Sequence, residues 1–442
     1  MSELSIYSGL SAHREKGYSP FHTPGHKCAG FFPQELLSLD LTELPDTDAL
    51  YEAGGIIANT EKKLSSLFGS EASLISCGGC TLAIQTMLAL SVMNGNKKVI
   101  FARNSHRSAV NACALLGIEP VWIMPESSSG YFTGRVTPGS VELALDNNPD
   151  AAAVYITSPS YYGELSDISG IAEVCHRSGK LLLVDNAHGS HLAFLEENLH
   201  PIHLGADMSA CSLHKTLPVL TGGAALNIAD GELAVYAKQK MALFGSTSPS
   251  YPIMASIDLC CDYMAGEGRE AYRRCEQRVR EIKQLAGNRG LLMPEGSCDP
   301  LRVCINTACA GLEAGRQTEY FHSFLVEPEM CDGANAVFIC TPFNSGTDML
   351  RLKAAVSGLS GRYGTVFPQS MTLPARLMLP REAVLSVSEP VSTERAAGRI
   401  AAESACPCPP GVPVVMPGEL IDDGSAELLA LCGIESILCV RE

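Results

Sequence analysis

The segment Lys180-Leu-Leu-Leu-Val-Asp185 is a short apolar run that ends on a carboxylate. Two similar runs precede it, Lys98-Val-Ile-Phe-Ala102 and Ala152-Ala-Val-Tyr-Ile-Thr157, and polar residues end or follow each of them. Helical stretches alternate with such runs from about Glu61 to Asn227, which is the pattern of βαβ units in a mostly parallel sheet. Because ligands of open α/β sheets bind beyond the carboxyl ends of the strands, we expect these strand ends to face one pocket.

The composition is that of a folded chain with an acidic balance. Of 442 residues, 46% are hydrophobic and 18% are charged, which excludes disorder and predicts two or three domains. A formal net charge of −16 argues against nucleic-acid or anionic-membrane partners and is compatible with small cationic substrates. No apolar run approaches the ~20 residues of a membrane span, and Met1–Gly17 lacks the pattern of a signal peptide. We therefore expect a cytoplasmic protein.

Lys215 is the first candidate for chemistry. It lies in Ser212-Leu-His-Lys-Thr216, 30 positions after the strand-terminal Asp185. A lysine beside His and Ser, downstream of such a carboxylate, is the arrangement expected of the lysine that forms a Schiff base with pyridoxal phosphate. The carboxylate would face the pyridine nitrogen and keep it protonated. Either residue alone is more often a surface lysine or a turn aspartate, whereas the combination favours the cofactor.

A phosphate-binding turn is predicted at Ser76-Cys-Gly-Gly-Cys-Thr81, which precedes a helical stretch. Glycines before a helix N-terminus present free N–H groups to a phosphate. The same turn contains Cys77 and Cys80, a spacing that alternatively indicates a redox pair or half of a metal site. No second pair of this kind follows, so we disfavour both alternatives. The 18 cysteines lie mostly in apolar runs and are interpreted as reduced core residues.

Three histidines extend the predicted site. His106 follows the strand that ends at Ala102, where it could lie flat against a cofactor ring or be an ordinary loop histidine. His188 and His191 form a pair whose spacing alternatively indicates metal ligands. Because Asp185 lies three residues upstream of His188, we favour a cofactor role for His188 and a structural role for His191, and we predict no metal site.

Eight segments, in this order, resemble one known family. They are Phe21-His-Thr-Pro-Gly-His-Lys27, Asp40-Leu-Thr-Glu-Leu-Pro45, Arg103-Asn-Ser-His-Arg-Ser108, Ser158-Pro-Ser-Tyr-Tyr-Gly163, Asp185-Asn-Ala-His-Gly-Ser-His191, Ser212-Leu-His-Lys-Thr216, Ser246-Thr-Ser-Pro-Ser-Tyr251 and Pro409-Pro-Gly-Val-Pro-Val-Val-Met-Pro-Gly-Glu419. The chain resembles the Orn/Lys/Arg decarboxylases, which are fold-type I (aspartate-aminotransferase-like) pyridoxal-phosphate enzymes, in their short bacterial form without an N-terminal wing domain.

The resemblance implies an α/β fold with a mainly parallel, seven-stranded sheet in a large domain and a smaller C-terminal α/β domain. We expect an N-terminal segment over residues 1–50, a large cofactor-binding domain over 51–287 and a small domain over 288–442 that includes the family's C-terminal signature. A charged helical stretch from Arg269 to Leu285 would connect the two domains. The resemblance also implies a homodimer or a higher homo-oligomer with shared active sites.

The resemblance also implies the roles of individual residues. Lys215 would hold the cofactor aldehyde, Asp185 would face the pyridine nitrogen, His106 would stack on the ring, and His188 would lie near the phenolic oxygen. The further cofactor contacts would be Gly78, Gly79, Cys80, Thr81, Ala187, Ser212, His214, Ser246 and Ser248. At positions 79 and 80 this chain has Gly and Cys where the family has a hydroxyl donor. Losing one charge-assisted hydrogen bond of about 1.5–3 kcal/mol would weaken cofactor binding by roughly one to two decades.

The implied activity is decarboxylation of arginine, lysine or ornithine, with a slight preference for arginine, which gives agmatine or a diamine plus CO2. Candidates for holding the substrate's distal cation are Asp46, Asp48, Glu52 and Glu419, although each is a typical capping or surface carboxylate. Three alternatives stay open: an aminotransferase or α-oxoamine synthase, a non-catalytic protein that binds pyridoxal phosphate, and a thiol-redox protein.

Overall fold

The structure is a computed structural model, and it describes residues 16–21, 43, 47–126, 134–362, 373–407 and 409–441. Most of the Phe21–Lys27 and Asp40–Pro45 motifs, and Asp46, lie outside the described residues. Within the described ranges, no helix is both long and apolar enough to cross a membrane.

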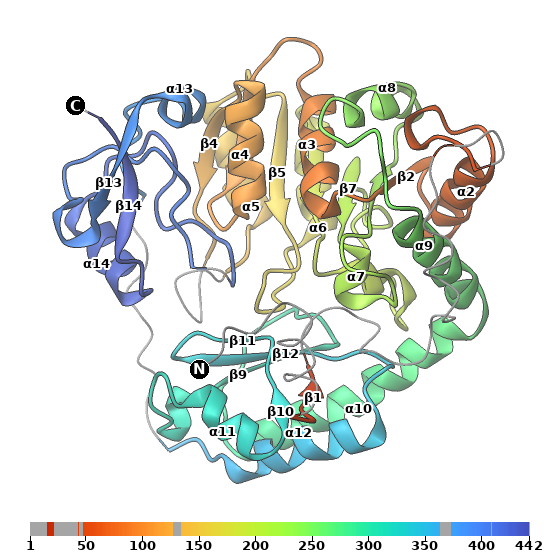
Figure 1. Ribbon diagram of the computed structural model, residues 1–442, viewed down its shortest axis with the longest axis vertical. Helices are drawn as coiled ribbons and strands as arrows, with labels where there is room; N and C mark the ends of the chain where they lie inside the picture. The colour runs from red at the N-terminus through yellow and green to blue at the C-terminus, as the bar shows by residue number, and fades with distance from the viewer. Residues whose placement is uncertain are drawn as a thin grey trace, which may run out of the picture.

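A seven-stranded sheet forms the upper part of the molecule (Figure 1). Its strands are β2 (Ala72–Ser76), β3 (Lys98–Ala102), β4 (Glu119–Ile123), β5 (Ala153–Thr157), β6 (Leu181–Asp185), β7 (Met208–Cys211) and β8 (Ala224–Ile228). They are ordered β2-β8-β7-β6-β5-β3-β4, and only β8 runs antiparallel to its neighbours among these strands. The mainly parallel seven-stranded sheet predicted from the sequence is therefore confirmed.

Helices cover both faces of this sheet because successive strand side chains point to opposite sides. The helices of one face are α3 (Gly79–Ser91), α4 (Arg107–Leu116) and α8 (Gly231–Met241), and those of the other are α5 (Pro138–Asn147) and α6 (Ile168–Arg177). In β3, Val99 and Phe101 belong to the apolar cluster on the side of α3, α4 and α8, while Ile100 belongs to the cluster on the side of α5 and α6. Full burial of each such side chain contributes about 1.5–3 kcal/mol.

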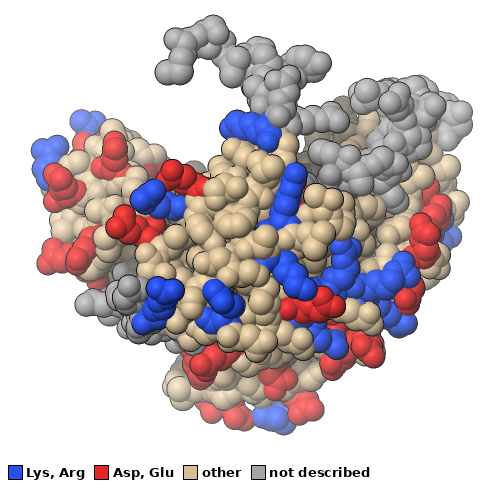
Figure 2. All heavy atoms as spheres, turned by 90° about the horizontal axis from the view of Figure 1, so that it is seen from below, with Lys and Arg blue, Asp and Glu red and all other residues tan. Residues whose placement is uncertain are grey.

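Three consecutive helical segments connect the large sheet to the lower part of the molecule. They are α9 (Tyr251–Tyr263), η4 (Met264–Gly268) and α10 (Arg269–Asn288), and α9 packs against α2 (Ile56–Phe68). The charged helix predicted from Arg269 is thus confirmed as α10. Arg and Glu pairs four residues apart lie along this helix, such as the exposed pair of Arg274 with Glu270 at 3.4 Å. Figure 2 views the molecule from below and shows basic and acidic side chains interspersed there.

The lower layer is a small antiparallel sheet of order β11-β12-β9. Its strands are β9 (Arg302–Asn306), β11 (Met330–Cys331) and β12 (Asn335–Ile339), and α11 (Gln317–Ser323) and α12 (Gly346–Gly358) lie beneath them (Figure 1). The N-terminal part of the chain reaches this layer, since β1 (Ser19–Pro20) pairs in parallel with β10 (Val326–Glu327). One apolar core joins the layer to α2, α9 and α10.

The last part of the chain forms a separate two-stranded sheet of β13 (Ser388–Ser392) and β14 (Ser436–Val440), with α13 (Pro380–Leu385) and α14 (Asp423–Leu431). Its core joins Val414 and Val415 to Val337 and Cys304 of the lower sheet. Residues after 288 therefore contribute strands to three sheets, β1-β10, β11-β12-β9 and β13-β14. The division into segments 1–50, 51–287 and 288–442 stays a prediction.

Candidate active site

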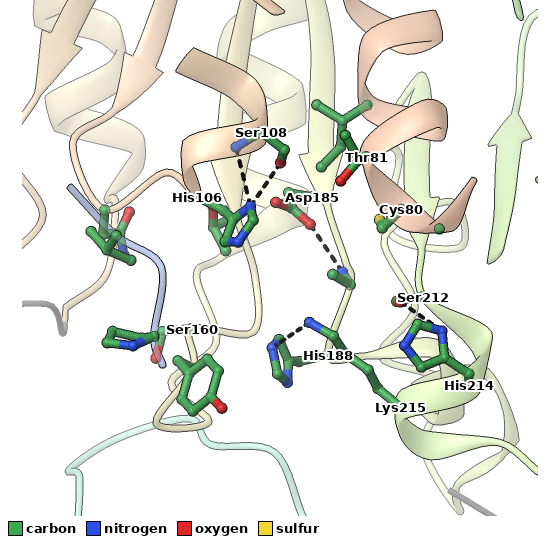
Figure 3. A pocket seen from close by; sticks show the side chains of 18 residues that line it. Cys80, Thr81, His106, Ser108, Ser160, Asp185, His188, Ser212, His214 and Lys215 are labelled. Atoms are coloured by element: carbon green, nitrogen blue, oxygen red, sulfur yellow. Dashed lines mark hydrogen bonds between the residues drawn. The ribbon is translucent and has the colours of Figure 1, made fainter. Parts of the chain in front are cut away.

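A cavity of about 290 Å³ lies at the carboxyl ends of the central strands (Figure 3). Thr157 ends β5, Asp185 ends β6 and Ser212 follows β7, and all three line the cavity. Its wall also contains Gly79, Cys80, Thr81, Ile84, Asn104, His106, Ser108, Ser160, Tyr161, Ala187, His188, His214, Lys215, Pro410 and Val412. The pocket predicted at these strand ends is therefore present.

Lys215 enters the cavity from α7 (Leu213–Thr216), the short helix after β7. Its Nζ lies 2.8 Å from His188 Nε2, and the other ring nitrogen of His188 lies 3.2 Å from Arg302 Nη2. Burial lowers the pKa of Lys215, and this outweighs the attraction of Cys80 and Asp185, which acts in the opposite direction. Burial also lowers the pKa of His188, and the nearby cations Lys215 and Arg302 lower it further. The lowered pKa of Lys215 favours the nucleophilic form of its amine, and His188 beside it is a partner for proton transfer.

Asp185 is 2% exposed and accepts two hydrogen bonds. Ala187 N–H donates to Oδ1 at 3.1 Å, and the Tyr155 hydroxyl donates to Oδ2, also at 3.1 Å. Burial raises the pKa of Asp185, whereas these two donors and Lys215 act to lower it. A buried carboxylate of this kind is stabilised by a cation placed against it, which is what a protonated pyridine would supply.

His106 is the N-cap of α4, and its Nδ1 accepts from the Ser108 N–H at 3.2 Å. Burial lowers its pKa to about 4, so the ring is neutral at neutral pH. The C-terminal motif packs against this ring, since a Cβ on Gly411 would lie 2.7 Å from its Cδ2 and Nε2. Gly411 adopts a φ of +74° and its carbonyl accepts from Arg107 N–H at 2.9 Å. A side chain at position 411 would therefore displace His106.

The turn before α3 presents a helix N-terminus to the cavity. N-cap Gly78 makes no side-chain hydrogen bond to the helix, and Gly79 N–H donates to Gly222 O at 2.9 Å. The N–H groups that follow in the first turn are the ones suited to an anion. Cys80 lines the cavity at this turn, and burial raises the pKa of its thiol. Thr81, Ser212 and His214 also line the cavity and supply polar groups.

Three residues of the predicted set do not line this cavity. Gly78, Ser246 and Ser248 line a neighbouring cavity of about 420 Å³, which shares Thr81 with the first.

Three of the carboxylates considered for the substrate's distal cation, Asp48, Glu52 and Glu419, are described by the structure, and they do not line the first cavity. Asp48 caps the local backbone, for example by accepting from Gly55 N–H at 2.8 Å, and Glu52 is exposed. Glu419 is 1% exposed and pairs with Arg103 at 3.0 Å, which anchors the C-terminal motif to the loop after β3. The capping interpretation therefore holds for Asp48, and a buried ion pair explains Glu419.

The alternative metal and thiol sites find little geometric support. His188 contacts Lys215 and Arg302, while His191 Nε2 lies 2.8 Å from Asp299 Oδ1, so the two histidines serve different neighbours. Among the described residues, no three or more His, Cys, Asp or Glu side chains are grouped to bind a metal. The 16 described cysteines form no disulfide with one another, and most of them are buried.

Sequence reasoning missed several members of this site. Tyr155 and Arg302 lie inside strands and look like ordinary strand residues, because their neighbours become visible only in the folded chain. Pro410 and Val412 belong to the C-terminal motif Pro409–Glu419, so the resemblance of that motif to the family could have indicated them.

Comparisons with known proteins cover nearly the whole chain. Residues 5–324 match the family model described as Orn/Lys/Arg decarboxylase, major domain, and residues 365–432 match the corresponding C-terminal domain. An arginine decarboxylase of Bacillus subtilis (strain 168) is 31% identical over 95% of this chain and 92% of its own length. An arginine decarboxylase of Halalkalibacterium halodurans is also 31% identical, over 96% of this chain and 92% of its own.

Solved structures show the same fold. Lysine decarboxylase A from Pseudomonas aeruginosa has a TM-score of 0.78 at 18% identity, and the match covers 98% of this chain and 80% of that chain. A lysine decarboxylase from Francisella novicida has a TM-score of 0.77 at 17% identity, with coverage of 93% and 76%.

Proposed function

The chain belongs to the Orn/Lys/Arg decarboxylase family, and from that premise we propose that it binds pyridoxal phosphate in the cavity at the strand ends and decarboxylates a basic L-amino acid, with arginine preferred. One observation carries the proposal: the Asp185 carboxylate, at the end of β6, and the Lys215 amine, on the short helix α7 that follows the neighbouring strand β7, enter the same cavity. They are the two groups that this cofactor needs from a protein.

The residues present fit the cofactor. Lys215 would hold its aldehyde, Asp185 its pyridine nitrogen, and His106 and Ala187 the two faces of its ring. The uncapped N-terminus of α3, with Thr81, Ser212 and His214, would hold its phosphate. Two buried oxygens in the wall, Asn104 Oδ1 and Thr157 Oγ1, lack hydrogen-bond partners, which supports a polar occupant.

The chain's own residues would orient the substrate and move protons. When bound, pyridoxal phosphate supplies an electron sink for the bond to the carboxylate that is lost. Asp185 would keep the pyridine nitrogen protonated, which maintains that sink. Lys215 Nζ and His188 Nε2, 2.8 Å apart, are placed to return a proton to the substrate carbon. Burial of these groups strengthens their electrostatic interactions by excluding water.

A second, larger cavity supports a cationic substrate. It has a volume of about 840 Å³ and shares Pro410 with the first cavity. Among the described residues, its lining contains the carboxylates of Glu327, Glu329 and Asp332 and no Lys or Arg. Glu329 acts electrostatically on Lys215 and accepts from the Tyr161 hydroxyl at 2.6 Å. We propose that Glu329 holds the distal cation, which suits a guanidinium because carboxylates bind its fork of N–H groups.

We also propose a cytoplasmic homodimer whose sites are shared. The neighbouring cavity lined by Ser246 and Ser248 adjoins the phosphate-binding turn at Thr81, so it offers a place where a second copy could approach. Mixing a Lys215→Ala chain with a Ser248→Tyr chain tests this, since a shared site restores activity in the mixture and an independent site does not.

Release of CO2 from arginine, lysine and ornithine tests the proposed activity directly. We expect turnover with pyridoxal phosphate, fastest with arginine, and none in Lys215→Ala. The variant Glu329→Gln should raise KM for the preferred substrate, whereas Glu327→Gln, in the same larger cavity, serves as its matched control. Keto-acid formation without CO2 would identify an aminotransferase instead. Cofactor binding without turnover of any of the three amino acids would identify a non-catalytic protein.

A further inference from the structure

A line of buried polar contacts connects Lys215 to the lower layer. His188 stands between Lys215 Nζ, at 2.8 Å, and Arg302 Nη2, at 3.2 Å. Arg302 belongs to β9 of the lower sheet and is 2% exposed. A buried guanidinium is costly unless it is held and paired, so its position calls for an explanation.

Arg302 is fixed by its own neighbours. Its Nη1 donates to Tyr161 O at 2.9 Å, and its Nε lies 3.9 Å from Asp299 Oδ2. Gly163 leaves room for the side chain, because a Cβ at that position would lie 2.7 Å from Arg302 Cγ. Asp299 also accepts from His191, and its interactions lower its pKa to about 2 despite burial, so it is anionic and balances Arg302. The guanidinium therefore reaches His188 in one orientation.

The chemistry of these groups fixes the proton of His188. A guanidinium can only donate hydrogen bonds, so His188 Nδ1 must accept from Arg302. Neutral His188 then carries its proton on Nε2, which donates to Lys215 Nζ. An amine accepts a hydrogen bond only when it is unprotonated. The reverse arrangement, with a charged Lys215 donating to Nε2, would place a proton on Nδ1 facing the guanidinium.

We propose that Arg302 is a positioning residue that fixes the tautomer of His188 and so keeps the Lys215 amine unprotonated, the form that reacts with an aldehyde. The inference rests on the proposed function, because that aldehyde is the one carried by pyridoxal phosphate. The other ionisable groups that the described residues place around the Lys215–His188 pair are Tyr161, whose ring lies 4.7 Å from that of His188, and Cys80, His106, Asp185, His214 and Glu329. All of them are retained in the variants described next.

Nitrogen-15 spectra of histidine-labelled, cofactor-free chain test the tautomer without any substitution of Arg302. The His188 resonances are assigned by their loss in His188→Gln. We expect neutral His188 with its proton on Nε2. A proton on Nδ1 in the wild-type chain would overturn the proposal, whatever the variants do.

The second test follows the pH dependence of acylation of Lys215 by an amine-selective reagent, mapped by mass spectrometry. Arg302→Met should raise the midpoint by on the order of one pH unit, which slows acylation about tenfold below both midpoints. Arg302→Lys keeps a charge and a donor and should restore the wild-type midpoint. Equal midpoints in wild type and Arg302→Met would overturn the proposal, and so would a midpoint in Arg302→Lys as high as in Arg302→Met.

These readouts separate the inference from the proposed activity. Both use the full chain without cofactor, so neither depends on CO2 release. Absence of CO2 release from all three amino acids would refute the decarboxylase proposal. It would not affect the proposal for Arg302, which the nitrogen-15 spectra and the acylation midpoints test independently. Thermal melting of each variant shows that it is folded before its midpoint is compared.

Discussion

The hydroxyl of Tyr155 can be removed with little other change to the site. It donates to Asp185 Oδ2 at 3.1 Å, and Ala187 N–H is the other donor to this carboxylate. Tyr155→Phe deletes one oxygen and keeps the ring, which packs 5.1 Å from Phe101. The variant therefore isolates one of two hydrogen bonds to the carboxylate proposed to face the pyridine nitrogen.

A hydrogen bond to a charged acceptor contributes about 1.5–3 kcal/mol. At about 1.36 kcal/mol for each pKa unit, its loss raises the pKa of Asp185 by roughly one to two units. The direction follows from the structure, because burial already raises this pKa and the Tyr155 hydroxyl opposes that rise. Asp185 must be ionised to hold a pyridinium. Affinity for pyridoxal phosphate is therefore lost as the pH falls, and the variant loses it at a higher pH.

The assay is a titration of the cofactor, followed by absorbance, over a series of pH values. In Tyr155→Phe, we expect the pH at which cofactor affinity is half lost on acidification to lie higher than in wild type by roughly one to two pH units. Tyr162→Phe is the matched control, since its buried hydroxyl donates to Asp332 at 2.8 Å and the residue does not line the cofactor cavity. If the curves of cofactor affinity against pH for Tyr155→Phe and wild type coincide, the reasoning is refuted.

Three further predictions concern packing, charge and pH. Gly411→Ala should lower the free energy of unfolding by more than the ~1–2 kcal/mol expected for Gly398→Ala, because both have positive φ but only Gly411 meets a neighbouring side chain. In denaturant melts, Arg103→Met should lower the free energy of unfolding by about 3–5 kcal/mol, because it leaves the Glu419 carboxylate buried without its partner. Arg177→Met, which removes an exposed ion pair, should lower it by about 1 kcal/mol or less. Because burial lowers the pKa of His106 from 6.5 to about 4, its contribution to stability is present above pH 6.5 and is lost as the pH falls toward 4, so His106→Gln should show a flatter pH dependence in melts over that window.

Each of these three predictions would be contradicted by a specific result. Equal destabilisation by the two glycine substitutions would show that the ring of His106 yields freely to a new side chain. A loss below about 1 kcal/mol in Arg103→Met would show that water reaches the remaining carboxylate. Parallel pH profiles for wild type and His106→Gln would show that His106 titrates normally in the folded chain.

Local sequence patterns predicted the large sheet and the position of its site. Apolar strands that end on polar residues specify both the burial of a strand and the edge where its last side chain lies, since each depends only on neighbours along the chain. Asp185 was found in this way, and Lys215 was found from its His and Ser neighbours downstream of that carboxylate. The strand order, with β8 between β2 and β7, was not predicted, because the pairing of strands depends on contacts between distant segments.

By itself the sequence determined the fold class, the edge of the sheet that carries the site, and the lysine and carboxylate within it. Only the tertiary structure decided what surrounds them: Arg302 lies 114 positions from the His188 that it contacts, and Arg103 lies 316 positions from Glu419. The physical reason is that the charge state of a buried group depends on which donors and charges fold against it. Those neighbours come from other layers of the molecule, so no local pattern records them.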